Sequence, residues 1–319
     1  MKKRSRIILA CGFVGLGLVI AYFLFAGLVM HRGASDTLRV GPLAEQLTPE
    51  TRPVDPRELG YRGDPQEAFG LPFESVSING ELGPAEAWYV PGARAESDLV
   101  AIYVHGVAGG REDGYRHLGL LHGAGISTAL ISYRNDEAAP ASPDGHYGFG
   151  LTEWRDLEGA VIAMRARGYE RVLLVGESMG GAIVGQFLRH SSQAEHVAGI
   201  ALDAPALDFR AILAFIGGRA GALFPHQVTE VAMTMFRLEG PVDLSQADVR
   251  AEIVGFDGPL FIAHGTGDTV VPVSITDEIV TRRRGMTFLL RSSGDHLLSY
   301  IENPERYARV FDGFLGALD

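Results

Sequence analysis

Lysine is almost absent from this chain of 319 residues. Its two lysines, Lys2 and Lys3, both precede the first apolar segment. The other 26 of the 28 lysine and arginine residues are arginines. The remaining chain therefore offers no lysine for a Schiff base, a phosphate-binding loop or a serine–lysine dyad. Only histidine, aspartate, glutamate or tyrosine can remove a proton in an active site here.

Cysteine is equally scarce, because Cys11 is the only one. No disulfide can form within the chain, and cysteine content says nothing about the redox compartment.

His117 and His122 do not form an H-E-x-x-H pattern, so the sequence predicts no metal site. Glycine-rich nucleotide-binding patterns are missing too, and we expect no cofactor. The net charge of −11 disfavours nucleic acid as a partner.

Charged residues are missing from the 24 residues Ile7–Met30. As a helix this run is about 36 Å long, enough to cross a hydrocarbon core of about 30 Å. The bases before the run outweigh those after it, which by the positive-inside rule places the following chain outside the cytoplasm. We expect a cytoplasmic basic segment over residues 1–6 and a single-pass transmembrane signal anchor over residues 7–30, with the lipid bilayer as partner.

Three other interpretations of this run remain open. It is long for the apolar part of a signal peptide, and no good A-x-A cleavage site follows, but cleavage is the main alternative. A lipoprotein modification at Cys11 has too little apolar sequence before it. A buried core helix is the third possibility.

The chain after the anchor divides by composition. Residues 31–70 are rich in proline, glycine and charge, and we interpret them as an extracytoplasmic linker. From residue 71 to 319, β-rich runs alternate with helical patterns, which is typical of an α/β domain with a mainly parallel sheet flanked by helices. The expected central strands are Leu99–His105, Thr128–Tyr133, Val172–Val175, Gly199–Asp203, Leu260–His264 and Thr287–Arg291, and two expected helices are Trp154–Ala166 and Ala182–His190.

Residues 208–256 break this alternation. Two helical, largely apolar pieces, Phe209–Ile216 and Val228–Phe236, stand where a short connection would suffice. We interpret the stretch as a short helical cap inserted after the strand that ends at Asp203. The alternative is an extra helical layer with no role at the site.

A Gly-x-Ser-x-Gly turn lies between an expected strand and an expected helix, which is the context of a nucleophile elbow. Ser178 is the candidate nucleophile. Gly176 and Gly180 stand two residues to either side, where larger side chains would collide with so sharp a turn. The backbone N–H of Met179 is a candidate oxyanion donor.

A serine nucleophile needs a base, and the base needs an orienting acid. His296 follows the last expected strand and Asp268 follows the strand before it, so both fall at the carboxyl ends of strands. Asp203 is the alternative candidate for the acid that orients the base, and Asp295 has at most a supporting role. We expect the second oxyanion donor to be the amide of Val107, with Gly106 allowing close approach and His105 stabilising the turn.

These motifs resemble the α/β-hydrolase superfamily, particularly its monoacylglycerol-lipase-like and serine-aminopeptidase-like branch, over residues 73–319. The resemblance rests on His105-Gly106, the Gly176–Gly181 elbow, Gly267–Pro272 and Gly294-Asp295-His296. It implies an α/β-hydrolase fold with a cap over the pocket, and ester, thioester or amide hydrolysis through an acyl-enzyme without a cofactor. Relatives that are epoxide hydrolases or dehalogenases carry aspartate at the elbow, and Ser178 argues against those reactions.

The expected protein is a membrane-anchored serine hydrolase, a carboxylesterase or lipase acting on acyl or lipid esters. A serine aminopeptidase of the same fold is the first rival, and it would need a cap acid such as Glu230 or Glu239 to hold the substrate's amino group. A catalytically silent binding protein is the second. Its mark would be a missing triad member, and none is missing.

Overall fold

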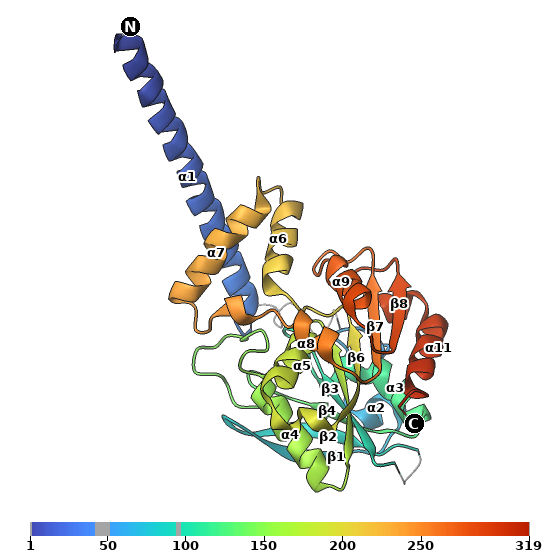
Figure 1. Cartoon of the computed structure of the whole chain (residues 1–319). Helices are drawn as coiled ribbons and strands as arrows, with labels where there is room; N and C mark the ends of the chain where they lie inside the picture. The colour runs from blue at the N-terminus through green and yellow to red at the C-terminus, as the bar shows by residue number, and fades with distance from the viewer. Residues whose placement is uncertain (1, 42–51, 94–96, 319) are drawn as a thin grey trace.

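The computed structural model describes residues 2–41, 52–93 and 97–318. An α/β domain is joined to a long amino-terminal helix, α1 (Lys2–Leu38), which projects from it (Figure 1). The mainly parallel sheet flanked by helices that the sequence predicted is confirmed. The sheet has eight strands in the order β1-β2-β4-β3-β5-β6-β7-β8.

Six strands, from β4 to β8 in this order, are parallel, and the hairpin β1–β2 adds an antiparallel edge. All six expected strands begin and end within two residues of the observed ones. The observed strand that corresponds to Val172–Val175 begins one residue earlier and ends two later, where it runs into the elbow. The strands are β1 (Glu74–Gly80), β2 (Gly83–Val90), β3 (Leu99–Val104), β4 (Ser127–Ile131), β5 (Arg171–Glu177), β6 (Val197–Asp203), β7 (Leu260–Gly265) and β8 (Thr287–Ser292).

Alternate residues of each central strand face two separate apolar layers. In β3, Val100 and Ile102 contribute to one core cluster, whereas Ala101 and Tyr103 contribute to the other. Both faces of the sheet are therefore covered, which explains why the parallel strands are apolar throughout rather than alternating.

The helices divide between these two faces and the cap. The first face is covered by α4 (Trp154–Ala166), α5 (Met179–His190), α8 (Arg250–Gly255) and α9 (Ser274–Arg282), and the second by α3 (Tyr115–Gly123) and α11 (Pro304–Leu315). The short α2 (Pro65–Phe69) and α10 (Ser299–Glu302) lie beside the second face.

Within the expected cap, only two helices stand away from the sheet: α6 (Phe209–Arg219) and α7 (Pro225–Glu239) (Figure 1). The third helix of that stretch, α8, packs on α5 and α9 and so belongs to the flanking layer. The cap proper is thus an antiparallel helical hairpin. Its partner is α1, which lies against α7 where Gly27 leaves room: a Cβ there would fall 2.5 Å from Val231.

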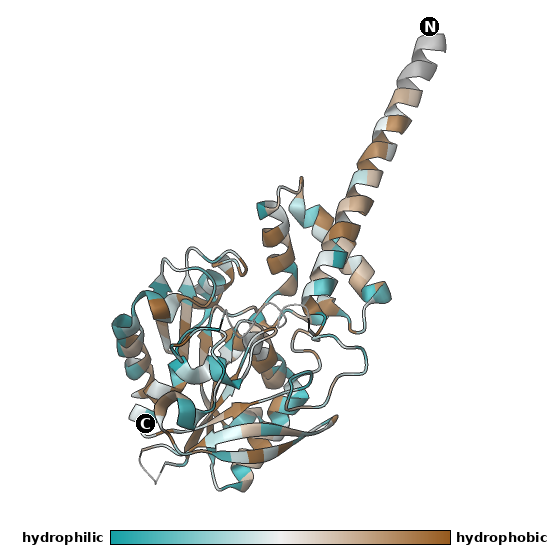
Figure 2. Cartoon of the chain, turned by 180° about the vertical axis from the view of Figure 1, so that it is seen from behind, coloured by the Kyte–Doolittle hydropathy of each residue, from teal (hydrophilic) through white to brown (hydrophobic). Residues whose placement is uncertain are grey.

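The amino-terminal helix is longer than the expected span. It continues past Met30 to Leu38, into residues expected to form a linker. The helical stretch Ala10–Leu38 is long and apolar enough to cross a membrane. Its outer half is apolar (Figure 2) and exposed along its length. A secretion signal meets the same two criteria, so this finding concerns length and composition alone.

Residues 52–70 lie against the domain where the structure describes them. The Tyr115 hydroxyl donates to the carbonyl of Gly63, and the amide of Gly60 donates to Asp113. Phe69 meets the Tyr115 ring edge-on. The carboxyl half of the expected linker is therefore packed on α3 and the loop before it, because its few aromatic and glycine residues fit that surface.

Candidate active site

Ser178 sits between β5 and α5 in a backbone conformation that serine rarely adopts, with φ at 51°. Such a conformation costs about 1–3 kcal/mol and persists only where the surroundings hold it. Here the Ser178 amide donates to the carbonyl of Asp203 at the end of β6, and the Ser178 carbonyl accepts from Ala206. The loop after β6 thus fixes the sharp turn that exposes the hydroxyl.

The two elbow glycines are required by the neighbouring backbone. A Cβ on Gly180 would fall 2.1 Å from the carbonyl oxygen of Val104, and one on Gly176 would fall 2.9 Å from the carbonyl carbon of Gly180. Both distances are below any real contact. The collision expected from the sequence is therefore with backbone, which cannot move aside as a side chain can.

The structure brings Ser178, His296 and Asp268 together from three separate loops. His296 Nε2 lies 3.0 Å from Ser178 Oγ, and His296 Nδ1 lies 2.8 Å from Asp268 Oδ2. The three residues follow β5, β7 and β8, whose carboxyl ends meet at one edge of the sheet. The arrangement can pass a proton from the hydroxyl to the imidazole while the carboxylate orients the ring.

Asp268 is built to remain ionised. Burial opposes its charge, but hydrogen bonds from His264 and His296 and from the amides of Val270 and Val271 outweigh that effect and hold its pKa well below the usual range. Sequence reasoning did not identify His264. The available signal was a histidine at the buried end of the strand, four residues before the acid.

The rival acid, Asp203, belongs to a different cluster beneath the elbow. Its carboxylate accepts a hydrogen bond from Tyr307 at 3.0 Å, while its backbone holds Ser178. Burial, reinforced by the charge of Glu177, raises its pKa. Since His296 pairs with Asp268, the geometry favours Asp268 as the orienting acid.

Glu177, immediately before the serine, forms a buried ion pair with Arg116, and it accepts a hydrogen bond from Tyr103 at 2.8 Å. Burial alone would raise its pKa, but Arg116, His117 and Tyr103 lower the pKa to about 2. His117, Glu177 and Asp203 are close enough to offer metal ligands. The guanidinium of Arg116 already neutralises Glu177, so this chemistry suits an ion pair better than a second cation.

Asp295 and His105 are held in supporting positions. Asp295 accepts hydrogen bonds from the amides of Thr269 and His296, and so ties together the loops after β7 and β8. His105 is fully buried, with Nε2 2.8 Å from Asp136 and Nδ1 2.9 Å from the carbonyl of Gly106. Both ring nitrogens are engaged, as a turn-stabilising residue requires.

The residues expected to donate to the oxyanion border the same site. Met179 is the first residue of α5, where an N–H has no acceptor within the helix. Val107 and Met179 both line the cavity above Ser178. A Cβ on Gly106 would fall 3.0 Å from the Cβ of Ser178, so the loop after β3 passes very close to the nucleophile.

This cavity has a volume of about 500 Å³ and mostly apolar walls. Phe209, Ile212, Leu213 and Ile216 of α6 form one wall, and Ala34, Thr37 and Leu38 of α1 form another. Sequence reasoning missed the contribution of α1, because nothing in a membrane-length helix indicates that its end will border a site. Neither Glu230 nor Glu239 lines the cavity; Glu230 pairs with Arg210 on the outside of the cap.

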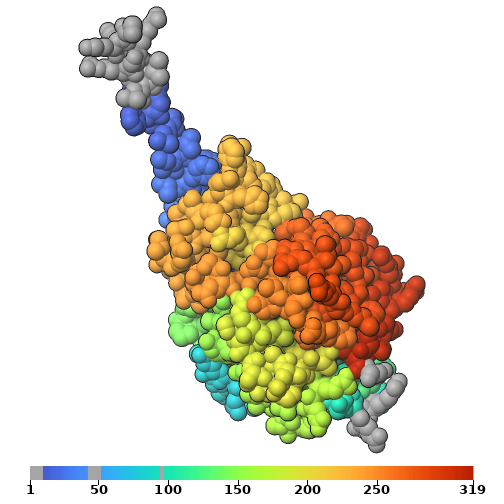
Figure 3. All heavy atoms as spheres, in the orientation of Figure 1, coloured from blue at the N-terminus to red at the C-terminus, as the bar shows by residue number. Residues whose placement is uncertain are grey.

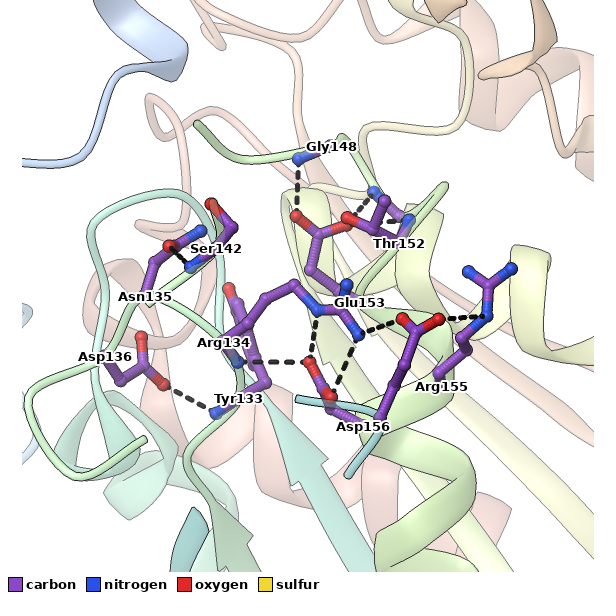
Figure 4. A network of polar contacts seen from close by, with 12 residues as sticks. Tyr133, Arg134, Asn135, Asp136, Ser142, Gly148, Thr152, Glu153, Arg155 and Asp156 are labelled. Atoms are coloured by element: carbon purple, nitrogen blue, oxygen red, sulfur yellow. Dashed lines mark hydrogen bonds and ion pairs between the residues drawn. The ribbon is translucent and has the colours of Figure 1, made fainter. Parts of the chain in front are cut away.

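The long loop after β4 supplies one more wall residue, Phe149, which meets Phe209 edge-on at 4.9 Å. The loop is pinned at both ends by the polar network of Figure 4. Asp156 accepts from the backbone and guanidinium of Arg134, and Glu153 accepts from the amides of Gly148 and Gly150. These contacts give the loop a defined path without strands or helices.

Comparison with known proteins identifies solved structures of similar fold. An esterase from Pyrococcus furiosus superimposes with a TM-score of 0.63 at 19% identity, covering 83% of this chain and 96% of its own. A thermophilic esterase from Thermogutta terrifontis gives 0.55 at 15% identity, with 77% and 99% covered. A bromoperoxidase from Bacillus anthracis gives 0.53 at 17% identity, with 76% and 100% covered. No protein-family model and no curated protein sequence matches the chain.

The elbow glycines generate a first prediction. Gly180→Ala should lower the free energy of unfolding by about 1–3 kcal/mol or more, because its Cβ meets a carbonyl oxygen that belongs to β3. Gly119→Ala is the matched control, since Gly119 is also helical and has nothing within 4 Å; it should raise stability by about 0.5–1 kcal/mol. Urea denaturation measures both, and equal effects would contradict the steric explanation.

The buried ion pair of Glu177 and Arg116 generates a second prediction. Glu177→Gln leaves the charge of Arg116 buried and unpaired, and should cost about 3–5 kcal/mol of unfolding free energy at pH 7. Glu86→Gln, in the half-exposed pair with Arg111, should cost less than about 1 kcal/mol.

The contribution of the Glu177–Arg116 pair to the free energy of unfolding should change with pH in a definite direction. The pKa of Glu177 in the folded protein, about 2, lies below the value of about 4.3 for an unfolded glutamate. The pair therefore stabilises the fold fully above that unfolded value, and its contribution declines as pH falls toward 2. The difference between the native protein and Glu177→Gln should shrink between pH 5 and 2, and a difference that grows would refute the assignment.

Proposed function

We propose that this chain, which has the α/β-hydrolase fold, is a serine hydrolase that cleaves carboxylic esters through an acyl-enzyme. The observation that carries the proposal is the relay of Ser178, His296 and Asp268, with contacts of 3.0 and 2.8 Å, at the floor of an apolar cavity. The esterase neighbours support it at the level of fold. Ser178 itself argues against the reactions that need an aspartate nucleophile.

In the first half-reaction, Ser178 Oγ attacks the ester carbonyl and its proton passes to His296 Nε2. Asp268 accepts a hydrogen bond from the Nδ1–H group of His296 and stabilises the imidazolium. The amides of Val107 and Met179 are assigned to the oxyanion. His296 then returns the proton to the leaving alcohol, and the acyl group stays on Ser178.

In the second half-reaction, water takes the place of the alcohol. His296 accepts a proton from the water as it attacks the acyl carbonyl, and the tetrahedral intermediate collapses to release the carboxylic acid and free Ser178. No group outside this chain, apart from water and the ester, is needed for the atoms to balance.

The walls of the cavity favour an acyl chain over a charged group. Phe149, Phe209, Ile212 and Leu213 present carbon to the space above Ser178, and burying a methylene there is worth about 0.8 kcal/mol. We therefore propose acyl or lipid-like esters as the substrate class. Each added methylene that fits should raise kcat/KM until the cavity is filled.

The aminopeptidase alternative finds less support in the cap. The acids proposed to hold a substrate ammonium, Glu230 and Glu239, lie outside the cavity. Asp113 lines it, but its two oxygens already accept hydrogen bonds from the amides of Gly60 and Gly110. No free carboxylate among the described cavity residues is placed to receive an amino group.

We also propose that α1 anchors the protein in a membrane with the hydrolase domain on the extracytoplasmic side. The exposed apolar side chains of Phe13, Leu18, Leu24 and Phe25 support the anchor, and the basic amino terminus supports the orientation. Cleavage within α1 would uncover the face of α7 against which it packs, and remove one wall of the cavity. Both consequences favour an intact helix.

Substitution of the relay tests the proposal directly. Ser178→Ala should reduce turnover of a short p-nitrophenyl ester by about 10⁴-fold or more, and Asp268→Asn by about 10⁴-fold through loss of the charge that orients His296. A fluorophosphonate probe should label the native protein and not Ser178→Ala. Full activity in Ser178→Ala, or labelling that survives the substitution, would end the assignment.

The pH profile tests the base. Asp268 keeps its charge well into acid because its pKa is held far below the usual range, so the orienting acid does not titrate while the general base gains its proton. We expect kcat/KM to fall in acid with the dependence of one proton, as general-base catalysis requires. A kcat/KM that does not change between pH 5 and 8 would count against a histidine base.

A further inference from the structure

One face of α6 forms a continuous apolar stripe that leads out of the cavity. Phe209, Ile212, Leu213 and Ile216 line the cavity at the i, i+3, i+4, i+7 spacing that places residues on the same side of a helix. The stripe is about 10 Å long. Its outer residue, Ile216, lines the cavity and is also 42% exposed. The space above Ser178 therefore opens toward the free end of the cap.

The opposite wall of this passage is the last turn and a half of α1. Ala34, Thr37 and Leu38 line the same cavity. The end of α1 is fixed to the domain by the loop after β4: the amide of Tyr147 donates to the carbonyl of Leu38 at 2.8 Å, and the amide of Val40 donates to that of Gly145 at 3.0 Å. The passage thus runs between α6 and α1, toward the side from which α1 projects.

The free end of the cap is apolar and exposed. Leu223 and Phe224, in the turn between α6 and α7, are 65% and 64% exposed. This turn points the same way as the amino-terminal half of α1 and stands beside it (Figures 1 and 3). The hydroxyl of Tyr22 donates to the carbonyl of Leu223 at 2.8 Å, and the rings of Phe23 and Phe224 are 6.2 Å apart.

The position of these contacts along α1 sets the depth of the turn. Tyr22 and Phe23 lie inside the uncharged run Ile7–Met30. About 20 of its residues are needed to cross the hydrocarbon core, so the core ends between roughly residues 26 and 30. The level of Tyr22 and Phe23 is then roughly 5–12 Å inside that boundary. A helix that spans the bilayer would carry Leu223 and Phe224 into the hydrocarbon with it.

We infer that the α6–α7 turn is inserted in the extracytoplasmic leaflet beside α1, and that the acyl chain of a membrane lipid reaches Ser178 from the bilayer, along the stripe of α6. This deepens the proposed function and rests on it. The lipid leaflet is the occupant because the exposed turn is continuous with the apolar surface of α1 at the same level. Arg219 at the end of α6 is exposed, with its guanidinium 5.7 Å from the Phe215 ring, and arginines near a membrane interface extend their charged ends toward the headgroups.

The opposite end of α7 supplies a control. Leu238 is 76% exposed, about 21 Å along the helix from Phe224. Nearby, the ring of Phe236 lies 4.4 Å from that of His31, beyond the uncharged run of α1. Two exposed leucines, Leu223 in the turn before α7 and Leu238 in its last turn, are thus assigned to different media, Leu223 to lipid and Leu238 to water.

Depth measurement tests the insertion. Because Cys11 is the only cysteine, a Cys11→Ser background allows a nitroxide label at Leu223→Cys or Leu238→Cys in the full chain, reconstituted in phosphatidylcholine vesicles. We expect the label at 223 to collide with oxygen in preference to a water-soluble nickel chelate, and the label at 238 to show the reverse. A label at 223 that meets the chelate freely, or that neither reagent reaches because a second copy covers it, would overturn the inference.

Activity on two substrates tests entry from the bilayer. The ratio of p-nitrophenyl palmitate hydrolysis in phosphatidylcholine vesicles to p-nitrophenyl acetate hydrolysis in solution should fall about tenfold in Leu223→Glu/Phe224→Glu. It should stay unchanged in Leu238→Glu. An unchanged ratio in the double variant, or a native protein that hydrolyses only the soluble ester, would overturn the inference. A native protein inactive on both esters would overturn the proposed function instead.

Discussion

The strained backbone at Ser178 is the constraint on which the rest of the site depends. A serine with φ at 51° is stable only because β6 and its loop hold the turn by hydrogen bonds, and because Gly180 lets the end of β3 approach while Gly176 lets the first turn of α5 pack on β5. The buried pair of Glu177 and Arg116 lies directly below and fixes the end of β5. The hydroxyl is thus presented by packed strands and not by a mobile loop.

The charges around the serine are arranged so that the proposed reaction would need little reorganisation. Asp268 is buried and accepts several hydrogen bonds, so it keeps its negative charge beside His296. Above the serine the walls are mostly apolar, which in the proposed reaction would strengthen the electrostatic stabilisation of a developing oxyanion. The Asp268 carboxylate, acting through His296, and the apolar cavity therefore meet at Ser178.

The amino-terminal helix connects this chemistry to the proposed membrane. Its outer half is exposed and apolar, its middle packs on α7, and its last turns border the cavity. A simple tether would have no reason to touch the substrate site. In our proposal the same helix holds the protein at the bilayer and forms part of the path by which an acyl chain reaches the serine, which would couple anchoring to substrate choice.

Local pattern determined much of this protein. The alternation of strands and helices, the glycine-flanked serine and the placement of Asp268 and His296 after apolar strands all follow from residues near one another in the chain, because parallel strands end at a common edge. Contacts between distant segments could not be predicted in this way. Only the folded chain placed Asp203 beneath the elbow and Ala34 in the wall of the cavity, since each depends on how whole helices and loops pack.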